Sequence, residues 1–161
     1  MTVDVRWARV DDAEALATML CEMAAHYRQA PLDHSLAAAT ARQWLGDESP
    51  AHPHFALAFV DDEVAGLASV AIAHPGIDLE RLMFLKDLFV RDSARDKGVG
   101  RALVGFLADH CLRKGIGRID FTTEDWNEGA LRFYSRLGAE RHGQKLFLRL
   151  PKAALNKIAR T

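Results

Sequence analysis

Hydrophobic side chains along this chain follow two different periods, and the change from one to the other marks its secondary structure. In residues 13–27, apolar side chains recur every three or four positions, which is the spacing of one face of an α-helix. Residues 55–60 and 64–73 are instead short apolar runs on either side of Asp-Asp-Glu, which is typical of two strands joined by a hairpin turn. The whole pattern predicts strands at residues 3–9, 55–60, 64–73, 82–90, 119–123 and 144–150, and helices at residues 13–27, 35–45, 100–114 and 127–137.

The predicted elements follow the order β-α-α-β-β-β-α-β-α-β-β, which includes one strand beyond the ranges above: the sixth strand, expected to form a hairpin with the strand at 144–150 around the sequence ERHGQK. A helix separates the strands at 82–90 and 119–123, so we expect that pair to be parallel, whereas strands joined by short turns should be antiparallel. The expected fold class is therefore α/β, an α+β mixed sheet with helices on its faces. Neither an internal repeat nor a linker interrupts the pattern, which favours a single domain over residues 1–161.

The ends of the predicted helices carry signals of their own. Asp11 or Asp12 should cap the helix at 13–27, and Ser35 should cap the next helix, which Gly46 ends. We expect loops at 47–54 and 74–80, and a tail over 151–161 that frays or forms a short helix.

Composition narrows the classes of function. The net charge of −1 gives no broad basic surface for nucleic acid. Cys21 and Cys111 lie in helical runs without a CxxC motif, so we expect two buried thiols and a reducing compartment. No apolar run approaches the roughly 20 residues of a membrane helix, and the first residues lack the core of a signal peptide, so the expected location is the cytoplasm. The seven histidines show no metal-ligand spacing, so no metal is expected.

The sequence RDKGVGRAL, residues 95–103, connects a predicted strand to a predicted helix. The first N–H groups of a helix have no acceptor within it, and the helix dipole adds partial positive charge there. Gly98 and Gly100 have no Cβ, so an anion can approach the backbone closely. Further positive charge around the turn comes from Arg95, Lys97 and Arg101. The turn therefore predicts a phosphate site, and the alternative is a tight connection whose glycines serve geometry alone.

Two well-known phosphate motifs do not fit this turn. The dinucleotide fingerprint needs a third glycine three positions after Gly100, where this chain has Leu103. The P-loop needs GxxxxGK[ST], which is absent. What remains is Arg-x-x-Gly-x-Gly at Arg95, Gly98 and Gly100, which is a weak signal by itself.

A second block of residues, downstream of this turn, indicates the family to which the turn belongs. Its members are Asn127, Ala130, Phe133, Tyr134, Leu137, Gly138 and Ala139. Together, the two blocks resemble the GNAT family of N-acetyltransferases. Its pyrophosphate loop is Arg/Gln-x-x-Gly-x-Gly/Ala, and its next signature is an Asn, a small residue, an aromatic pair and a Leu-Gly end. The predicted order of elements also resembles the GNAT fold. The sequences KDLFV and EDWNEGALRFYSRLGA look most like the diamine branch, which includes spermidine/spermine and thialysine acetyltransferases.

The resemblance implies that acetyl-CoA is the co-substrate. In the family, the backbone of the strand before the loop pairs with pantetheine, which points to Leu88, Phe89 and Val90, and the next strand splays away to admit it. The pyrophosphate would lie on the loop formed by Arg95, Asp96, Lys97, Gly98, Val99, Gly100 and Arg101. Asp96 would contribute only its backbone, because a carboxylate beside a pyrophosphate is unfavourable. The helix after the loop would add Asn127, Ala130, Phe133 and Tyr134 to the cofactor-binding set.

Tyr134 is the candidate general acid that the resemblance implies. A phenol has a pKa of about 10, so it keeps its proton at neutral pH and can donate it to the departing thiolate. Asn127 lies seven positions earlier and shares a helical face with Tyr134, although it is first an N-cap for its own helix. Phe133 is expected to serve mainly the core.

The acceptor amine must lose a proton before it attacks, and a carboxylate acting through water can accept that proton. The carboxylates that could do this are Asp87, Glu124, Asp125 and Glu22, each with a solvated charge as the alternative. Asp87 is taken as the candidate catalytic residue, and Glu22 and Glu124 as candidate substrate-binding residues. The polyamine enzymes carry an acid immediately before the strand Asp, where this chain has Lys86. Lys86 would repel a cationic amine, and it can instead pair with the carboxylate of an amino-acid-like substrate.

The resemblance implies an acetyl-CoA-dependent N-acetyltransferase that acts on the primary amine of a small molecule, such as a polyamine, a diamine or an amino-acid-like compound. Two alternatives stay open: acetylation of a protein or peptide, and an inactive acyl-CoA-binding sensor. A homodimer is the common state of the family and is expected here.

Overall fold

The computed structural model describes residues 2–47, 54–74 and 79–159. They form two compact units, Met1–Thr122 and Thr123–Thr161. The loops expected at 47–54 and 74–80 lie largely outside the described residues. The single domain expected over residues 1–161 stays a prediction.

The first unit is built on a mixed sheet of five strands in the order β1-β2-β3-β4-β5. Their bounds are Val3–Trp7, His54–Val60, Glu63–Ala73, Leu82–Val90 and Arg118–Phe121. Strands β1 to β4 pair antiparallel, and β4 pairs with β5 in parallel. The turn between β2 and β3 is made by Asp61 and Asp62, whose positive φ angles of 50° and 64° match the right-handed twist of a hairpin. The mixed sheet predicted from the sequence is confirmed.

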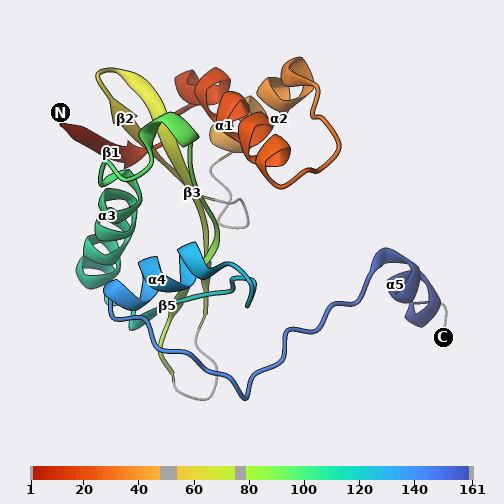
Figure 1. The fold of residues 1–161 in the computed structure, drawn as a ribbon. Helices are drawn as coiled ribbons and strands as arrows, with labels where there is room; N and C mark the ends of the chain where they lie inside the picture. Colours follow the sequence, from red (N-terminus) through yellow and green to blue (C-terminus); the bar gives the residue numbers. More distant parts are fainter. Residues whose placement is uncertain (1, 48–53, 75–78, 160–161) are drawn as a thin grey trace. The chain divides into compact units, whose positions relative to one another are not determined.

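Helices cover both faces of this sheet (Figure 1). α1 (Ala13–His26) and α2 (His34–Gly46) lie on one face, and α3 (Val99–Lys114) lies on the other. Strand β2 contributes side chains to the hydrophobic clusters on both faces of the sheet. Its Phe55 and Leu57 pack with Leu16 and Met19 of α1, and Ala56 and Ala58, which alternate with them, pack on the side of α3. Large and small side chains therefore alternate on the two faces, as the period of a strand requires.

The helix ends agree with the sequence, with two corrections. Asp12 lies at the N-cap of α1, but its carboxylate makes no cap bond to that helix and instead accepts from the Arg9 N–H and from Arg6. The cap of α2 is Asp33, whose Oδ1 accepts the N–H of Leu36 at 2.8 Å, and Ser35 lies inside the first turn. An N-cap side chain accepts from the residue two or three positions later, so a helix that begins at His34 needs its cap at Asp33. Cys111 on α3 is buried, and this burial raises the pKa of its thiol. Among the described residues, no helix has the length and apolar content to cross a membrane.

The second unit contains α4 (Glu128–Arg136) and α5 (Lys152–Ile158). The prediction of two final strands is wrong: residues 139–150 have no regular secondary structure. The apolar run that suggested the last strand stays mostly exposed, at Leu146, Phe147, Leu148 and Leu150. A strand needs a neighbouring ladder to bond with, and residues 139–150 make none in this unit. The tail that was expected to fray or form a short helix is largely the helix α5.

Candidate active site

The connection from β4 to α3 is the glycine turn, and its backbone is shaped by two left-handed residues. A short 3₁₀ turn, η2 (Asp92–Ala94), leaves the strand. Asp96 then has φ 59° and Gly98 has φ 82°. Asp tolerates this region better than most residues, and Gly adopts it freely. A Cβ placed on Gly98 would meet no heavy atom within 4 Å, so the space above the turn is open.

Helix α3 begins at Val99 directly after this turn. Val99 is only 1% exposed and is packed against the sheet at Gly66. A Cβ on Gly66 would come within 3.0 Å of the Val99 side chain, so glycine allows the first turn of α3 to sit close to β3. Ala102 N–H donates to Gly98 O at 2.9 Å and closes the first helical turn. The N–H groups of Val99, Gly100 and Arg101 therefore have no acceptor within the helix. Such a set of donors suits an anion.

The strand before the turn has one edge that β5 leaves uncovered. β5 pairs with the first part of β4, from Leu82 to Leu85, and this pairing stops there. Leu88, Phe89 and Val90 pair with β3 on their other side. Among the described residues, no strand bonds to their second edge. An extended ligand with amide groups can add to such an edge as an extra strand does.

A bulge lies in the middle of β4. Ser69 of β3 faces Asp87, but the next residue, Val70, faces Leu85, so Lys86 is the extra residue. Ser69 is 4% exposed, and its hydroxyl donates to Asp87 Oδ2 at 2.6 Å. Lys86 Nζ donates to the same oxygen at 3.0 Å, and its side chain is 71% exposed. Asp87 is thus held at Oδ2 by two donors, while its side chain keeps 26% of its surface exposed.

Glu22 lies near the end of α1 and is paired with a cation. Its carboxylate accepts two bonds from Arg91, at 2.5 and 3.3 Å. Arg95 of the glycine turn also has protein partners: its Nε donates to Val90 O at 3.2 Å and its Nη2 lies 2.8 Å from Asp92 Oδ1. The Arg95 Nη2 also lies 3.3 Å from Nδ1 of His26.

The second unit carries the remaining residues that the sequence singled out. The Asn127 side chain accepts the N–H of Ala130 at 3.1 Å, which confirms it as the N-cap of α4. Phe133 and Tyr134 are in edge-to-face contact, with ring centroids 5.1 Å apart. Glu124 lies in the exposed segment before α4, and its carbonyl accepts the N–H of Asn127.

The first unit therefore brings together the turn at 95–101, the uncovered edge at 88–90, Glu22, Lys86 and Asp87, and the second unit holds Glu124, Asn127, Ala130, Phe133 and Tyr134. Ser69, His26 and Arg91 are not among the site residues predicted from the sequence. Ser69 was detectable, because it is the only polar side chain in residues 64–73. The other two look like ordinary surface charges in the sequence, and only the packing of α1 against β4 gives them partners.

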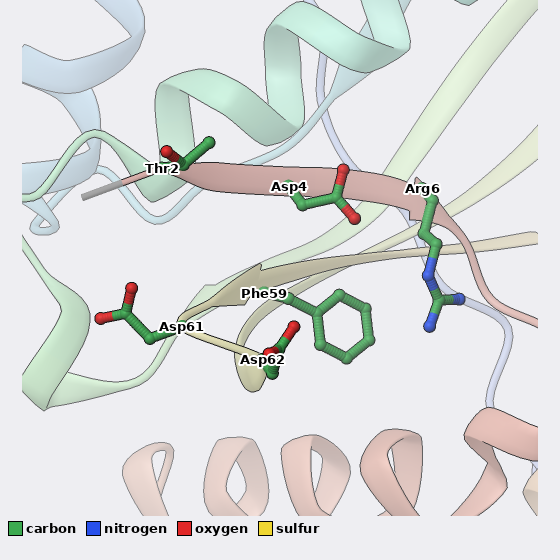
Figure 2. A pocket seen from close by; sticks show the side chains of 6 residues that line it. All are labelled: Thr2, Asp4, Arg6, Phe59, Asp61 and Asp62. Carbon is green, nitrogen blue, oxygen red and sulfur yellow. The ribbon is translucent and has the colours of Figure 1, made fainter.

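A hollow of about 360 Å³ lies elsewhere, at the end of β1 and β2, and contains no predicted site residue. It is lined by Thr2, Asp4, Arg6, Phe59, Asp61 and Asp62. The three carboxylates are spread around it and do not meet at one point (Figure 2). Arg6 is held by two hydrogen bonds to Asp12, which keep the pKa of that carboxyl below its ordinary value. Among the described residues, no group of three His, Cys, Asp or Glu side chains is arranged to hold a metal ion.

Comparison with known proteins links these observations. The model of the acetyltransferase (GNAT) family matches residues 16–139, a range that contains both the glycine turn and α4. The chain is 31% identical over 98 residues to L-ornithine N5-acetyltransferase of Arabidopsis thaliana; that match covers 61% of this chain and 43% of the plant enzyme, less than half of its length.

Two further matches extend along nearly the whole chain. Thialysine N-epsilon-acetyltransferase of Caenorhabditis elegans is 29% identical over 153 residues, which is 92% of each chain. A solved structure of an integron cassette protein from the mobile metagenome of V. cholerae has a TM-score of 0.87 at 28% identity, over 100% of this chain and 99% of that one.

Proposed function

The chain belongs to the acetyltransferase (GNAT) family and is an N-acetyltransferase, and we propose that it transfers the acetyl group of acetyl-CoA to a primary amine of a small molecule. One observation carries the donor half of this proposal. The left-handed, open turn at Gly98 presents the first N–H groups of α3 shortly after the strand edge at 88–90, to which no strand bonds among the described residues. A turn that served geometry alone would not need an uncovered strand edge beside it.

The donor then lies along this edge and ends at the turn. The two amides of pantetheine bond to the backbone of Leu88, Phe89 and Val90, as an added strand would. The pyrophosphate accepts from the N–H groups of the loop formed by Arg95, Asp96, Lys97, Gly98, Val99, Gly100 and Arg101. The partial positive charge of the α3 dipole and the charges of Lys97 and Arg101 favour a dianion there.

The chemistry needs a group that protonates the leaving sulfur. The amine nitrogen attacks the thioester carbonyl, a C–N bond forms and the C–S bond breaks. We assign the proton that neutralises the coenzyme A thiolate to Tyr134, whose phenol keeps that proton at neutral pH. Asn127, Ala130 and Phe133 fix the position of Tyr134 on α4, because Asn127 caps that helix and the ring of Phe133 packs against the phenol.

Asp87 is the residue we assign to the amine. Its Oδ2 is occupied by Ser69 and Lys86, so Oδ1 is the oxygen that can accept from an ammonium or from the water that removes its proton. Lys86 remains a candidate for contact with the acceptor, as does Glu124. Glu22 is a weaker candidate, because Arg91 takes both of its carboxylate oxygens.

An amino-acid-like acceptor is favoured among the small amines. Two relatives are named for the side-chain amine of an amino acid, ornithine in one and thialysine in the other. The exposed ammonium of Lys86, directly beside Asp87, supplies a cation for the carboxylate of such an acceptor. A polyamine has no carboxylate to meet it.

We place the reaction in the cytoplasm and assign the enzyme a homodimeric state. The first assignment rests on the two free thiols at Cys21 and Cys111, which fit a reducing compartment. Light scattering of the purified protein tests the second, and a monomer at micromolar concentration would overturn it.

An acceptor panel tests the proposed function. Thiol release from acetyl-CoA is followed with ornithine, thialysine, spermidine, common amino acids and short peptides. We expect the two diamino acids to give the highest kcat/KM. Acetylation of peptides alone would make the enzyme a peptide acetyltransferase, and tight coenzyme A binding without turnover would make it a sensor.

A further inference from the structure

The end of α1 holds the segment that joins β4 to the glycine turn. Glu22 and His26 are four positions apart, so they lie on one face of the helix. Glu22 contacts Arg91 and His26 contacts Arg95, which stand at the two ends of η2. One helical face thus meets both flanks of the short turn that leads into the loop.

The contact between Glu22 and Arg91 is a bidentate ion pair. Arg91 Nη2 donates to Oε1 at 2.5 Å and Nε donates to Oε2 at 3.3 Å. The side chains are only 37% and 22% exposed, so the pair is partly shielded from water. The backbone of Arg91 is also fixed, because its N–H donates to Ala65 O of β3 at 3.1 Å. A planar guanidinium on a carboxylate sets orientation as well as distance.

The second contact fixes the side chain of Arg95. A guanidinium donates and never accepts, so the ring nitrogen of His26 is the acceptor at 3.3 Å. The imidazole itself is held by the ring of Phe89, with centroids 5.8 Å apart, and Phe89 is buried in the core beneath α1. Arg95 also bonds to Val90 O and Asp92, so its guanidinium is directed to the loop and to α1.

From these contacts, we propose that Glu22 and His26 are positioning residues for the donor: they hold Arg91 and Arg95, and thereby set the glycine turn in the conformation that receives the pyrophosphate of acetyl-CoA. The inference rests on the proposed function, in which the turn binds that pyrophosphate. It gives Glu22 a role that differs from direct contact with the acceptor.

The experiment separates positioning from general stability by using two donors. Acetyl-CoA carries the pyrophosphate, whereas S-acetylpantetheine does not. For Glu22→Gln, we expect the Kd for acetyl-CoA to rise about tenfold, as small misplacements of binding groups do, while the KM for S-acetylpantetheine stays at the wild-type value. Calorimetry and steady-state kinetics give the two constants, and thermal melting reports the fold.

Three further variants make the result specific. Glu14→Gln removes a carboxylate that pairs with Arg42 at the other end of α1, and it should leave both donors unaffected. The exchange of Glu22→Arg with Arg91→Glu restores the pair in reverse and should recover most of the acetyl-CoA affinity. Should Glu22→Gln not fold, Arg91→Lys keeps the charge without the fork and carries the same expectation for the two donors.

The possible results distinguish a failure of the proposed function from a failure of the positioning role. If the wild-type protein does not bind coenzyme A, the proposed function fails before the positioning question arises. If the wild type binds it and Glu22→Gln binds equally well, the positioning role is wrong while the function stands. Equal losses for both donors with a lowered melting temperature would also overturn it, because the ion pair would then serve only the fold.

Discussion

In the proposed function, two stretches of the same strand, β4, serve two different tasks by different means. The last three residues, Leu88, Phe89 and Val90, lead into the glycine turn, and there the donor would bond to their backbone groups. The middle of the strand, at Lys86 and Asp87, offers side chains, and their position depends on a bulge and on Ser69 of the neighbouring strand. Backbone geometry can be specified by a few glycines in one short sequence, whereas a side-chain site requires residues from several strands.

The largest expected effect is at the donor end. Gly100→Glu places a carboxylate among the first N–H groups of α3, where the pyrophosphate would bind, and like charges at such a contact cost several kcal/mol. We expect acetyl-CoA affinity to fall at least about 100-fold by calorimetry. Gly105→Glu is the control, because Gly105 is an exposed glycine of the same helix with open space around it. Unchanged affinity in Gly100→Glu would remove the turn from the donor site.

Tyr134→Phe tests whether the chemical step is separable from donor binding. Removal of a general acid typically lowers turnover by about 100-fold or more, and the ring itself remains for packing. We expect that loss in kcat with an unchanged Kd for coenzyme A. Wild-type turnover would show that another group protonates the thiolate.

Features that depend on local backbone geometry could be predicted from the sequence, whereas contacts between side chains of different strands could not. Gly98, Gly100 and Asn127 act through the backbone near them in the chain, and local spacing was enough to identify the glycine turn and the cap of α4. The prediction of a strand at 144–150 is wrong, because an apolar pattern does not specify which neighbouring strand the segment would pair with. Leu146, Phe147 and Leu148 remain exposed. The Ser69–Asp87 bond joins residues 18 positions apart, which depends on the register between β3 and β4.

Ser69→Ala tests whether the hydrogen bond to Asp87 supports acceptor binding independently of donor binding. A hydrogen bond to a charged group is worth about 1.5–3 kcal/mol, so loss of this donor should raise the acceptor KM about tenfold by releasing Asp87. The Kd for acetyl-CoA should not change. Thr40→Ala removes a hydroxyl that bonds within α2 and serves as the control. A change in donor affinity that matches the change in acceptor KM would mean that the two stretches of β4 are not independent.

The smallest effect is expected at Lys86. Its side chain is exposed, and exposed charge pairs contribute about 0.2–1 kcal/mol, so Lys86→Glu should shift KM by only about two- to fivefold. The direction is informative: spermidine should improve and an amino acid acceptor should worsen. Lys152→Glu on α5 reverses an exposed charge away from β4 in sequence and is the control. An identical acceptor profile for Lys86→Glu would place this side chain outside the acceptor site.

We propose that this enzyme moves an acetyl group from coenzyme A to the primary amine of a small molecule. The most direct test of this proposal is a single NMR experiment in which ¹³C-labelled acetyl-CoA is incubated with the enzyme and an equal mixture of ornithine, thialysine and a short peptide. We expect the label to appear as an acetamide on the side-chain nitrogen of a diamino acid, and we expect Gly100→Glu to abolish the signal. Label that stays on coenzyme A, or that appears only on the peptide, would contradict the proposal.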